Sequence, residues 1–321
     1  MKALCRPILF MTLVTPVFFS LSCQKLSDRA SEAAASEERP PIIDVHVHAY
    51  PAWDSKSGDP SLFPESLTFA RSDEELLEEI LQNFERFNIV KAVAFGGRLE
   101  SLQKAAPGRI IPGYQRHVGN ETKPEDLTWL RREFSSGRYA MLAELWVQPS
   151  GAAPNDAHVE PYFKMAEELD VPIGIHMGPA AAAPVNAYWP QYRVALGNPL
   201  LLEDTLIRHP RLRVYVMHAG WPFLEEMIGL MFAHPRVYVD VSLINWLLPR
   251  EEFHRYLRGL VEAGFGKRIM FGSDQTVWLG VIASAIEGIE SADFLTAEQK
   301  RDIFYHNAVR FLRVEAGSAD H

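Results

Sequence analysis

The chain has 321 residues, of which 47% are hydrophobic, 23% charged and 11% aromatic, proportions typical of a globular protein with a large core. This composition excludes an intrinsically disordered or collagen-like chain. The formal net charge of -9 argues against nucleic acid as a partner, because binding to a phosphate backbone requires clustered cations.

The first 22 residues have the pattern of an export signal peptide. Lys2 and Arg6 form a basic start, and an apolar run from Pro7 to Phe19 follows. This run is shorter than the roughly 20 residues that a transmembrane helix needs. Residues 23–40 are rich in Ser, Ala and Glu, which predicts a flexible tether after the signal.

Cys5 and Cys23 are the two cysteines, so we expect neither a disulfide framework nor a zinc site built from cysteines. The small residue before Cys23 resembles the lipobox of bacterial lipoproteins, although Ser20 replaces the preferred leucine. This resemblance implies that Cys23 is lipidated and anchors an exported, periplasmic-side domain to the membrane. Soluble secretion after cleavage nearby and an uncleaved anchor are the alternatives.

Beyond Pro41, short runs of β-branched and apolar residues alternate with amphipathic segments, a pattern that predicts a parallel sheet with helical crossovers. The predicted strands are Ile42–His48, Val90–Phe95, Ile110–Tyr114, Tyr139–Val147, Pro172–Met177, Arg213–His218, Val237–Val241 and Arg268–Gly272. The predicted helices are Leu76–Phe87, with Ser72 and Glu75 as a capping box, and Glu125–Phe134, Pro161–Leu169, Pro199–Arg208, Phe223–Phe232, Arg250–Ala263 and Thr296–Leu312.

Two crossovers end alike, in Arg208-His209-Pro210 and Ala233-His234-Pro235, and each leads into a Val-Tyr-Val strand. This similarity indicates repeated strand–helix units rather than a second domain. Eight strands with helices over residues 41–314 predict a single-domain (β/α)₈ TIM-like barrel. A doubly wound open sheet is the alternative, and residues 315–321 are expected to form a disordered tail.

Polar residues close five of the predicted strands, at the end where parallel barrels carry their active sites. In the first strand, a period of two points His46 and His48 to one side, inward if Ile42 and Asp44 also point inward. The other strand-end residues are Glu144, His176, His218 and Asp274.

Burying several titratable groups at one end of a sheet is costly unless they are paired or bind a metal. We therefore interpret His46, His48, His176 and Asp274 as ligands of a divalent metal ion. His218 is either a further ligand or a general base, and Glu144 is either a ligand or a carboxylate close to the substrate. Structural or surface roles are expected for the other histidines, which are His117, His158, His209, His234, His254, His306 and His321.

Asp44-x-His46-x-His48, His176, His218, Gly272-Ser273-Asp274 and Asn307-Ala308-x-Arg310-Phe311 together resemble the amidohydrolase superfamily. The resemblance is to the branch that includes aminocarboxymuconate-semialdehyde decarboxylase and related lactone hydrolases. It implies a catalytic metal, Zn²⁺ by preference, on His46, His48, His176 and Asp274, with His218 in acid/base chemistry or as a further ligand.

The chain departs from the binuclear members of the superfamily at the fourth strand. Those members place a carboxylated lysine where this chain has Glu144, and neither Lys91 nor Lys164 is expected to supply such a carbamate. A glutamate at this position resembles the TatD-like arrangement, in which a carboxylate bridges two metals. A second ion bound through Glu144 is therefore an open alternative.

A bound metal ion lowers the pKa of water and polarises a carbonyl, which predicts hydrolysis of a lactone, amide or related bond in a small substrate that can carry a carboxylate. Asp274 would take the proton of the attacking water, and His218 would stabilise the oxyanion or shuttle the proton. Decarboxylation of a carboxylated aromatic or muconate-like substrate is the alternative. A third possibility is a non-catalytic binding lipoprotein.

Substrate contacts are expected from the loops that follow the strands. In the loop 178–193, Arg193 can pair with a substrate carboxylate or form a salt bridge on the outer face, and Tyr188 can line an apolar pocket. Trp221 and Trp278 follow His218 and Asp274 closely and are candidates for substrate contact, with rim packing as the alternative. A homo-oligomer is also left open.

Overall fold

Eight parallel strands form one sheet, and each strand pairs with its neighbours along the chain. The computed structural model describes residues 39–52, 68–119, 123–179 and 189–315. The strands in sheet order are β1 (Ile42–His48), β3 (Ile89–Phe95), β4 (Ile110–His117), β5 (Met141–Trp146), β6 (Ile173–His176), β7 (Val214–Met217), β8 (Val237–Asp240) and β9 (Ile269–Met270). Each overlaps one of the predicted strands.

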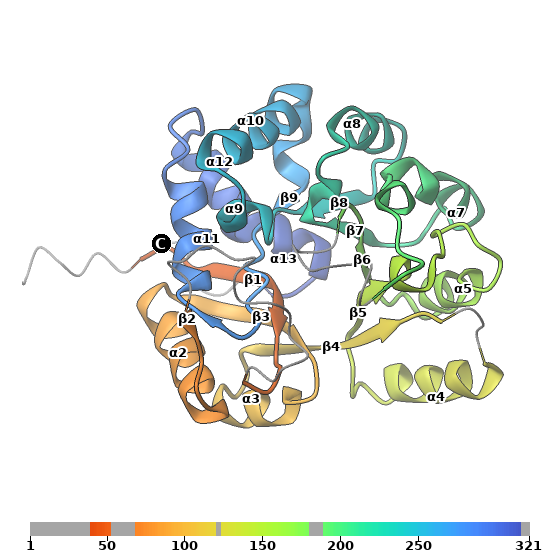
Figure 1. The fold of residues 1–321 in the computed structure, drawn as a ribbon, viewed down its shortest axis with the longest axis horizontal. Coiled ribbons are helices and arrows are strands. Elements are labelled where there is room, and N and C mark those ends of the chain that lie inside the picture. Colours follow the sequence, from red (N-terminus) through yellow and green to blue (C-terminus); the bar gives the residue numbers. More distant parts are fainter. Residues whose placement is uncertain (1–38, 53–67, 120–122, 180–188, 316–321) are drawn as a thin grey trace, which may run out of the picture. The chain divides into compact units, whose positions relative to one another are not determined.

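Helices connect the strands and lie around the outside of the sheet (Figure 1). The α-helices are α2 (Asp73–Arg86), α3 (Leu99–Ala105), α4 (Pro124–Ser135), α5 (Glu160–Leu169), α7 (Glu203–Arg208), α8 (Leu224–Ala233), α9 (Ile244–Leu247), α10 (Arg250–Leu260), α11 (Val281–Glu290), α12 (Ala297–Arg301) and α13 (Asn307–Leu312). Short 3-10 helices are η2 (Gln148–Ser150), η3 (Val194–Gly197), η4 (Pro199–Leu202), η5 (His218–Gly220) and η7 (Gly266–Arg268), and π-helical turns are η6 (Val261–Phe265) and η8 (Asp302–His306). Within the described residues, none of these helices has both the length and the hydrophobicity of a membrane span.

The barrel closes between β1 and the residues that follow β9. Val45 N donates to Phe271 O at 3.0 Å, Asp274 N to His46 O at 2.9 Å, and His48 N to Gln275 O at 2.7 Å. These main-chain bonds confirm the predicted (β/α)₈ barrel over the open sheet. They also bring the backbone of Asp274 directly beside that of His46.

Large apolar side chains fill the inside of the barrel, and the last helices cover the end at which the strands begin. Arg213, directly before β7, donates to the carbonyl of Phe311 in α13 at 3.1 Å. The interior cluster comprises Ile43, Val45, Val93, Phe95, Met141, Ala143, Tyr215, Met217 and Met270, with Tyr305, Ala308 and Phe311 from η8 and α13. The opposite end, where the strands finish, is left for polar side chains.

The simple alternation that we expected for β1 is wrong. Ile42 packs in the outer layer between sheet and helices, whereas Ile43 and Val45 belong to the interior cluster. The pairing of β1 with β3 shifts register between Ile42 and Ile43 and again between Asp44 and Val47. The strand is thus irregular directly before the two histidines, so period-two counting does not apply across it.

Several elements were not anticipated, among them α3, α9, α11 and a small antiparallel pair of β2 (Thr68–Phe69) with β10 (Trp278–Leu279). The capping box of α2 is only half formed. The Ser72 hydroxyl accepts from Glu75 N at 3.2 Å, but the Glu75 carboxylate accepts from Arg71 N at 2.6 Å rather than from Ser72 N. The predicted signal peptide, most of the tether, and residues 316–321 of the predicted tail lie outside the described residues.

Candidate metal centre

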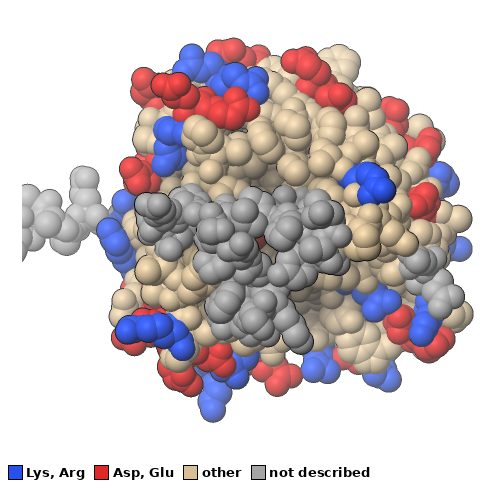
Figure 2. Space-filling view, viewed as in Figure 1, with Lys and Arg blue, Asp and Glu red and all other residues tan. Residues whose placement is uncertain are grey.

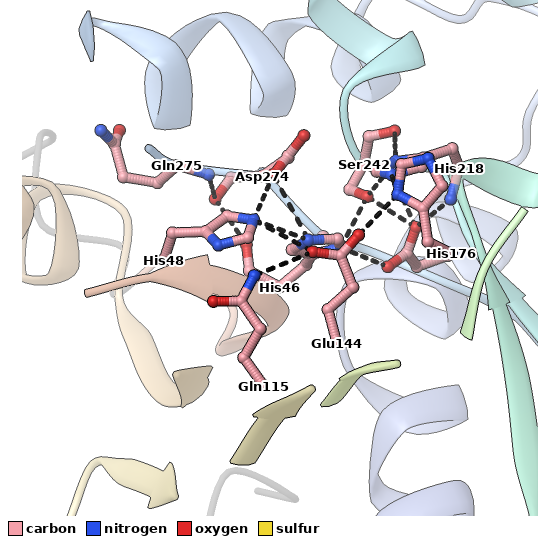
Figure 3. Close-up of polar contacts among 12 residues, drawn as sticks. His46, His48, Gln115, Glu144, His176, His218, Ser242, Asp274 and Gln275 are labelled. Atoms are coloured by element: carbon pink, nitrogen blue, oxygen red, sulfur yellow. Dashed lines mark hydrogen bonds and ion pairs between the residues drawn. The ribbon is translucent and has the colours of Figure 1, made fainter. Parts of the chain in front are cut away.

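Three side chains with metal-binding atoms converge where β1 meets the segment after β9 (Figure 3). The Nε2 atoms of His46 and His48 lie 3.2 Å apart. Oδ1 of Asp274 lies 3.3 Å from Nε2 of His46 and 2.9 Å from Nε2 of His48. All three side chains are buried. The carboxyl end of β1 supplies both imidazoles, and the closure of the barrel supplies the carboxylate.

Asp240, the last residue of β8, holds the other side of the His46 ring. Its Oδ2 lies 3.0 Å from His46 Nδ1, and its Oδ1 accepts hydrogen bonds from the Ser242 hydroxyl at 2.7 Å and from His218 N at 2.8 Å. An imidazole that donates through Nδ1 to a carboxylate keeps its Nε2 lone pair for a metal ion. Asp240 therefore orients His46 as a ligand.

Glu144, on β5, lies between the histidines of β1 and His176 at the end of β6 (Figure 3). Its Oε1 lies 2.5 Å from His176 Nδ1 and its Oε2 lies 3.9 Å from His48 Nε2. Gln115 of β4 donates to Oε2 at 3.3 Å. Among the residues that the structure describes, the buried Nε2 of His176 has no hydrogen-bond partner. Leu142, two residues before Glu144, packs in the outer layer, and the register of β5 shifts between Leu142 and Leu145, so regular alternation along this strand does not predict the direction of Glu144.

His218 follows β7 and lies against His176, with its Nε2 3.2 Å from His176 Nδ1. Its Nδ1 lies 3.1 Å from the carbonyl oxygen of Ser242. A carbonyl can only accept, so Nδ1 carries the hydrogen and Nε2 keeps a lone pair in the neutral ring. Burial and the neighbouring charge of His176 lower the pKa of His218 to about 4, and the ring is therefore neutral at pH 7.

His218 and Asp274 share a left-handed backbone conformation, with φ angles of 56° and 55°. Residues other than glycine rarely adopt this conformation, and the strain tends to accumulate at functional sites. Met217 already faces the interior, so the next residue of a regular strand would face outward. The left-handed turn lets His218 point into the site instead.

The buried charges favour a positive species at the centre of the site. Burial alone would raise the carboxylate pKa values, but the neighbouring histidines outweigh it and hold the pKa of Glu144 well below its usual range and that of Asp274 below its ordinary value. Burial alone would lower the pKa of His46, yet Asp274, Asp240 and Glu144 raise it to about 9. Deeper in the barrel, burial raises the pKa of Asp44 to about 7.

The residues present fit a divalent metal ion. Imidazole and carboxylate are the ligands of zinc and related cations, and tetrahedral bonds of about 2.0–2.2 Å place ligand atoms about 3.3–3.6 Å apart. The separations among His46, His48 and Asp274, from 2.9 to 3.3 Å, lie at or slightly below the lower end of that range. Three overlapping sets of three buried residues could each hold a metal ion, because one ligand atom from each residue of a set lies within 4.8 Å of the others. The sets are His46/His218/Asp240, His46/His48/Glu144 and Glu144/His176/His218.

The structure brings all six strand-end candidates together, namely His46, His48, Glu144, His176, His218 and Asp274, and their individual roles stay predictions. Lys91 lies within β3, but its ammonium donates to the carbonyl of Gly108 at 2.5 Å, before the start of β4. Its amine therefore lies at the end of the barrel away from the candidate metal centre.

The candidate substrate-binding residues have other partners. The exposed Arg193 donates to the carbonyls of Pro190 and Tyr192 in its own loop, at 2.9 and 2.7 Å. The Trp221 indole donates to Glu252 of α10 at 3.0 Å, and Trp278 is buried in β10, where it packs against Trp246 and Phe69. Tyr188 lies outside the described residues. Contact of these residues with substrate stays a prediction.

Sequence reasoning missed Asp240 and Ser242. The predicted strand ran through Val241, which left Asp240 inside the strand, whereas β8 ends on Asp240 as β1 and β6 end on His. That repeated strand-end pattern is the signal that could have found it. Trp146 was also missed, and its ring lies 4.8 Å from the ring of His176 and 4.9 Å from that of Trp189.

The sequence model of the amidohydrolase family matches residues 43–314. Among curated proteins, protein fluG of Emericella nidulans is 25% identical over 129 residues, which are 35% of this chain and 15% of that protein. The chain thus spans about a seventh of the length of this relative.

Solved structures share the fold at low sequence identity. A TIM-barrel protein of Bordetella bronchiseptica matches with a TM-score of 0.64 at 17% identity, covering 85% of this chain and 98% of that one. A probable 2-pyrone-4,6-dicarboxylic acid hydrolase of Acinetobacter baumannii matches with 0.57 at 15% identity over 85% and 99% of the chains. A 5-carboxyvanillate decarboxylase of Novosphingobium aromaticivorans, complexed with manganese, matches with 0.56 at 13% identity over 88% and 97%.

Replacing His46 and His48 together by alanine should abolish stoichiometric binding of divalent metal, because it removes two of the converging nitrogen atoms. Elemental analysis of the purified protein measures the loss, and circular dichroism checks that the fold persists. His254→Ala is the matched control, since His254 bonds to the carbonyl of Gly288 on the outer helices. Undiminished metal in the double variant would contradict the site.

Asp240→Asn should weaken metal binding by about 10–100-fold, because the neutral amide no longer stabilises the Nδ1–H of His46. Competition with a chromophoric chelator measures the dissociation constant without reference to turnover. Asp156→Asn serves as the control, since among the contacts described the carboxylate of Asp156 accepts only from Ala153 N in its own turn. If Asp240→Asn bound the metal ion as tightly as the wild type does, Asp240 would have no role in orienting His46.

Proposed function

The chain belongs to the amidohydrolase family, and from this membership and its metal-binding geometry we propose that it is a metal-dependent hydrolase of a small carbonyl substrate. The observation that carries the proposal is the convergence of His46 Nε2, His48 Nε2 and Asp274 Oδ1 within 3.3 Å of one another. His176, whose buried Nε2 has no hydrogen-bond partner in the described part of the chain, completes the proposed ligand set. Zn²⁺ is the proposed ion, since three imidazoles and one carboxylate suit it.

A bound divalent ion supplies Lewis acidity, which polarises a carbonyl and makes water acidic enough to attack it near neutral pH. Asp274 is the proposed proton acceptor for that water. The neighbouring histidines keep it ionised, and the carboxylate oxygen other than Oδ1 points away from His46 and His48 in Figure 3. A carboxylate in this position can take a proton from water and return it to the leaving group.

His218 is proposed to act on the substrate side of the reaction. Because its Nδ1–H is held by the carbonyl of Ser242, the neutral ring presents Nε2 towards the centre of the site. It can accept a proton there during the reaction and then donate it, or it can ligate the metal. The hydrogen bond to Asp240 holds its main chain in the left-handed conformation.

Glu144 is the reason for preferring hydrolysis over decarboxylation. Its two oxygens lie towards His176 on one side and His48 on the other, and it belongs to two of the three potential ligand groups. A carboxylate between two sets of nitrogen ligands supports a second ion, and two-ion sites favour activation of water. A decarboxylase that works with one metal does not need this additional ligand.

The proposed substrate is a small molecule with a lactone, amide or related bond and a planar or aromatic part. Trp146 lies beside His176 and contacts Trp189 edge to face, so an apolar wall stands next to the site. Such walls bind planar groups through stacking and burial. A carboxylate on the substrate fits the acid named for the Acinetobacter baumannii hydrolase, whose fold this chain shares.

Turnover in ¹⁸O-labelled water distinguishes hydrolysis from decarboxylation. A panel of lactones, amides and carboxylated aromatics first identifies a substrate. We expect the label to enter the product carboxylate without release of carbon dioxide, because the attacking atom comes from water. Mass spectrometry of the product and a carbon dioxide assay measure the two outcomes. Stoichiometric carbon dioxide without label would instead establish the decarboxylase.

Glu144→Gln provides an independent check of the same proposal. It should reduce metal content to about one ion per chain and slow turnover by a factor on the order of 10² if the carboxylate is a ligand. Glu133→Gln is the matched control, because Glu133 is a buried glutamate of α4 that pairs with Arg132 and Arg138.

We also propose that the protein is exported and anchored through lipidated Cys23. The supporting features are the basic start, the apolar run and the small residue before the cysteine. A single acyl chain binds membranes only marginally, so stable anchoring implies several chains on this cysteine.

In a bacterial host, labelled fatty acid should enter the wild-type chain, and Cys23→Ser should abolish the label and release the protein from the membrane fraction. Cys5→Ser is the control and should keep both properties, because Cys5 lies within the segment that is removed. Release of unlabelled wild-type protein into the soluble fraction would favour simple secretion.

A further inference from the structure

The end of the barrel opposite the metal centre carries an excess of basic residues. Among the described residues, the seven short segments that lead from an α-helix into a barrel strand contain seven Lys or Arg residues and two acidic residues, Asp170 and Glu262. The basic residues are Arg109, Arg138, Arg211, Arg213, Arg236, Lys267 and Arg268. This concentration contrasts with the net charge of -9 of the whole chain.

Carboxylates lie within 3.3 Å of the cationic groups of four of these residues, and Arg211 forms a longer ion pair, at 3.8 Å, with Glu167. Arg109 bonds to Glu85, Arg138 to Glu133, Arg213 to Asp170, and Lys267 to Glu298 and Asp302. The remaining three, Arg211, Arg236 and Arg268, lie before the consecutive strands β7, β8 and β9. The positive charges with the weakest carboxylate pairing therefore lie together at the base of the barrel, beside β7, β8 and β9.

Hydrogen bonds from arginine side chains to main-chain carbonyls connect the segments that carry these three arginines. Arg236 donates to the carbonyl of Arg211 at 3.3 Å, and Arg268 donates to the carbonyls of Met231 at 2.8 Å and His234 at 3.2 Å. The side chain of Arg211 is 71% exposed and lies 3.8 Å from Glu167. Bonds to carbonyls leave the charge of Arg236 and Arg268 uncompensated.

Two large apolar side chains are exposed next to the same loops. Ile207 is 66% and Phe232 is 83% exposed. Each stands two residues before the His-Pro pair that the sequence repeats. His209 is fixed between Glu160 at 2.7 Å and Glu167 at 3.2 Å, and His234 lies 3.5 Å from Glu203. His209 thus holds the end of α7 against the two glutamates, and the apolar side chains that precede both His-Pro pairs are exposed.

The described chain also enters the barrel at this end, because Arg39 and Pro40 directly precede the start of β1. Cys23 is sixteen residues before Arg39 in the sequence. An extended chain reaches about 3.3–3.6 Å per residue, so this connection spans at most about 55 Å. An anchor at Cys23 would therefore be tied to the end of the barrel that carries Ile207, Phe232 and the three arginines.

We propose that the basal face, formed by Ile207, Arg211, Phe232, Arg236 and Arg268, docks on a bilayer that contains anionic lipids. Exposed aromatic and aliphatic side chains flanked by arginine are the chemistry of an interfacial membrane contact. Docking in this way turns the strand ends, with the metal centre, towards the solution. A second copy of the chain is a poorer occupant, because an isologous contact would bring the same arginines of two copies together.

The test uses the full chain with Cys5→Ser and Cys23→Ser, made by cell-free synthesis so that the N-terminal segment is not cleaved, and the apolar run from Pro7 to Phe19 then keeps each variant at the vesicle surface. A single cysteine at the exposed Ala233 carries an environment-sensitive nitrobenzoxadiazole dye, and a second sample carries it at Arg71, at the start of α2 near the strand ends. With vesicles of about 30% phosphatidylglycerol and brominated lipid, we expect strong quenching at 233 and none at 71.

Two double variants then separate the contributions of the basal face. Ile207→Ser with Phe232→Ser, and Arg211→Gln with Arg236→Gln, should each abolish most of the quenching at 233 while the chain still sediments with the vesicles. Arg71→Gln with Lys123→Gln is the matched control and should change nothing. Equal quenching at 233 and 71, or quenching that survives both basal variants, would overturn the proposal. So would a dimer in solution that Phe232→Ser dissociates, with no quenching at 233, since it would assign the face to a second copy.

Discussion

Four carboxylates and four imidazoles are withdrawn from water at one end of this barrel, and the cost of burying them shapes the structure around them. Asp44 receives hydrogen bonds from the main-chain nitrogens of His46 and Ser273, and it thereby joins β1 to the segment after β9. Asp240 joins His46 to the turn after β7. The contacts that close the barrel are thus the same ones that assemble the site, and the fold and the metal centre depend on each other.

The strands and the strand-end residues could be predicted because apolar runs that end in His, Glu or Asp follow directly from the way a parallel barrel is built. Side-chain direction could not be predicted in the same way. The register shifts in β1 and β5 and the left-handed backbone of His218 place side chains inward that simple alternation would misplace. These irregularities are set by tertiary hydrogen bonds, which a single sequence does not reveal. Asp240 was not predicted for a related reason: its partners, His46 and His218, are distant in sequence, so no local pattern pairs it with them.

The two ends of the barrel carry different kinds of side chain. Buried carboxylates at the strand ends favour a cation, whereas the basal face presents arginines and exposed apolar groups. His209, in the first of the repeated His-Pro pairs, has no part in the proposed reaction and fixes the helix end that carries Ile207. A tether that enters at the base would hold the active end away from a membrane and open to small substrates.

X-ray absorption spectroscopy of the zinc-loaded chain tests the central claim, which is that His46, His48, His176 and Asp274 bind a metal directly. The account predicts a first shell of about four to five nitrogen and oxygen atoms at about 2.0–2.2 Å, with the outer-shell scattering of about three imidazole rings. The imidazole signal should fall when His46 and His48 are replaced. A shell of oxygen atoms alone, without imidazole scattering, would contradict the metal centre described for this barrel.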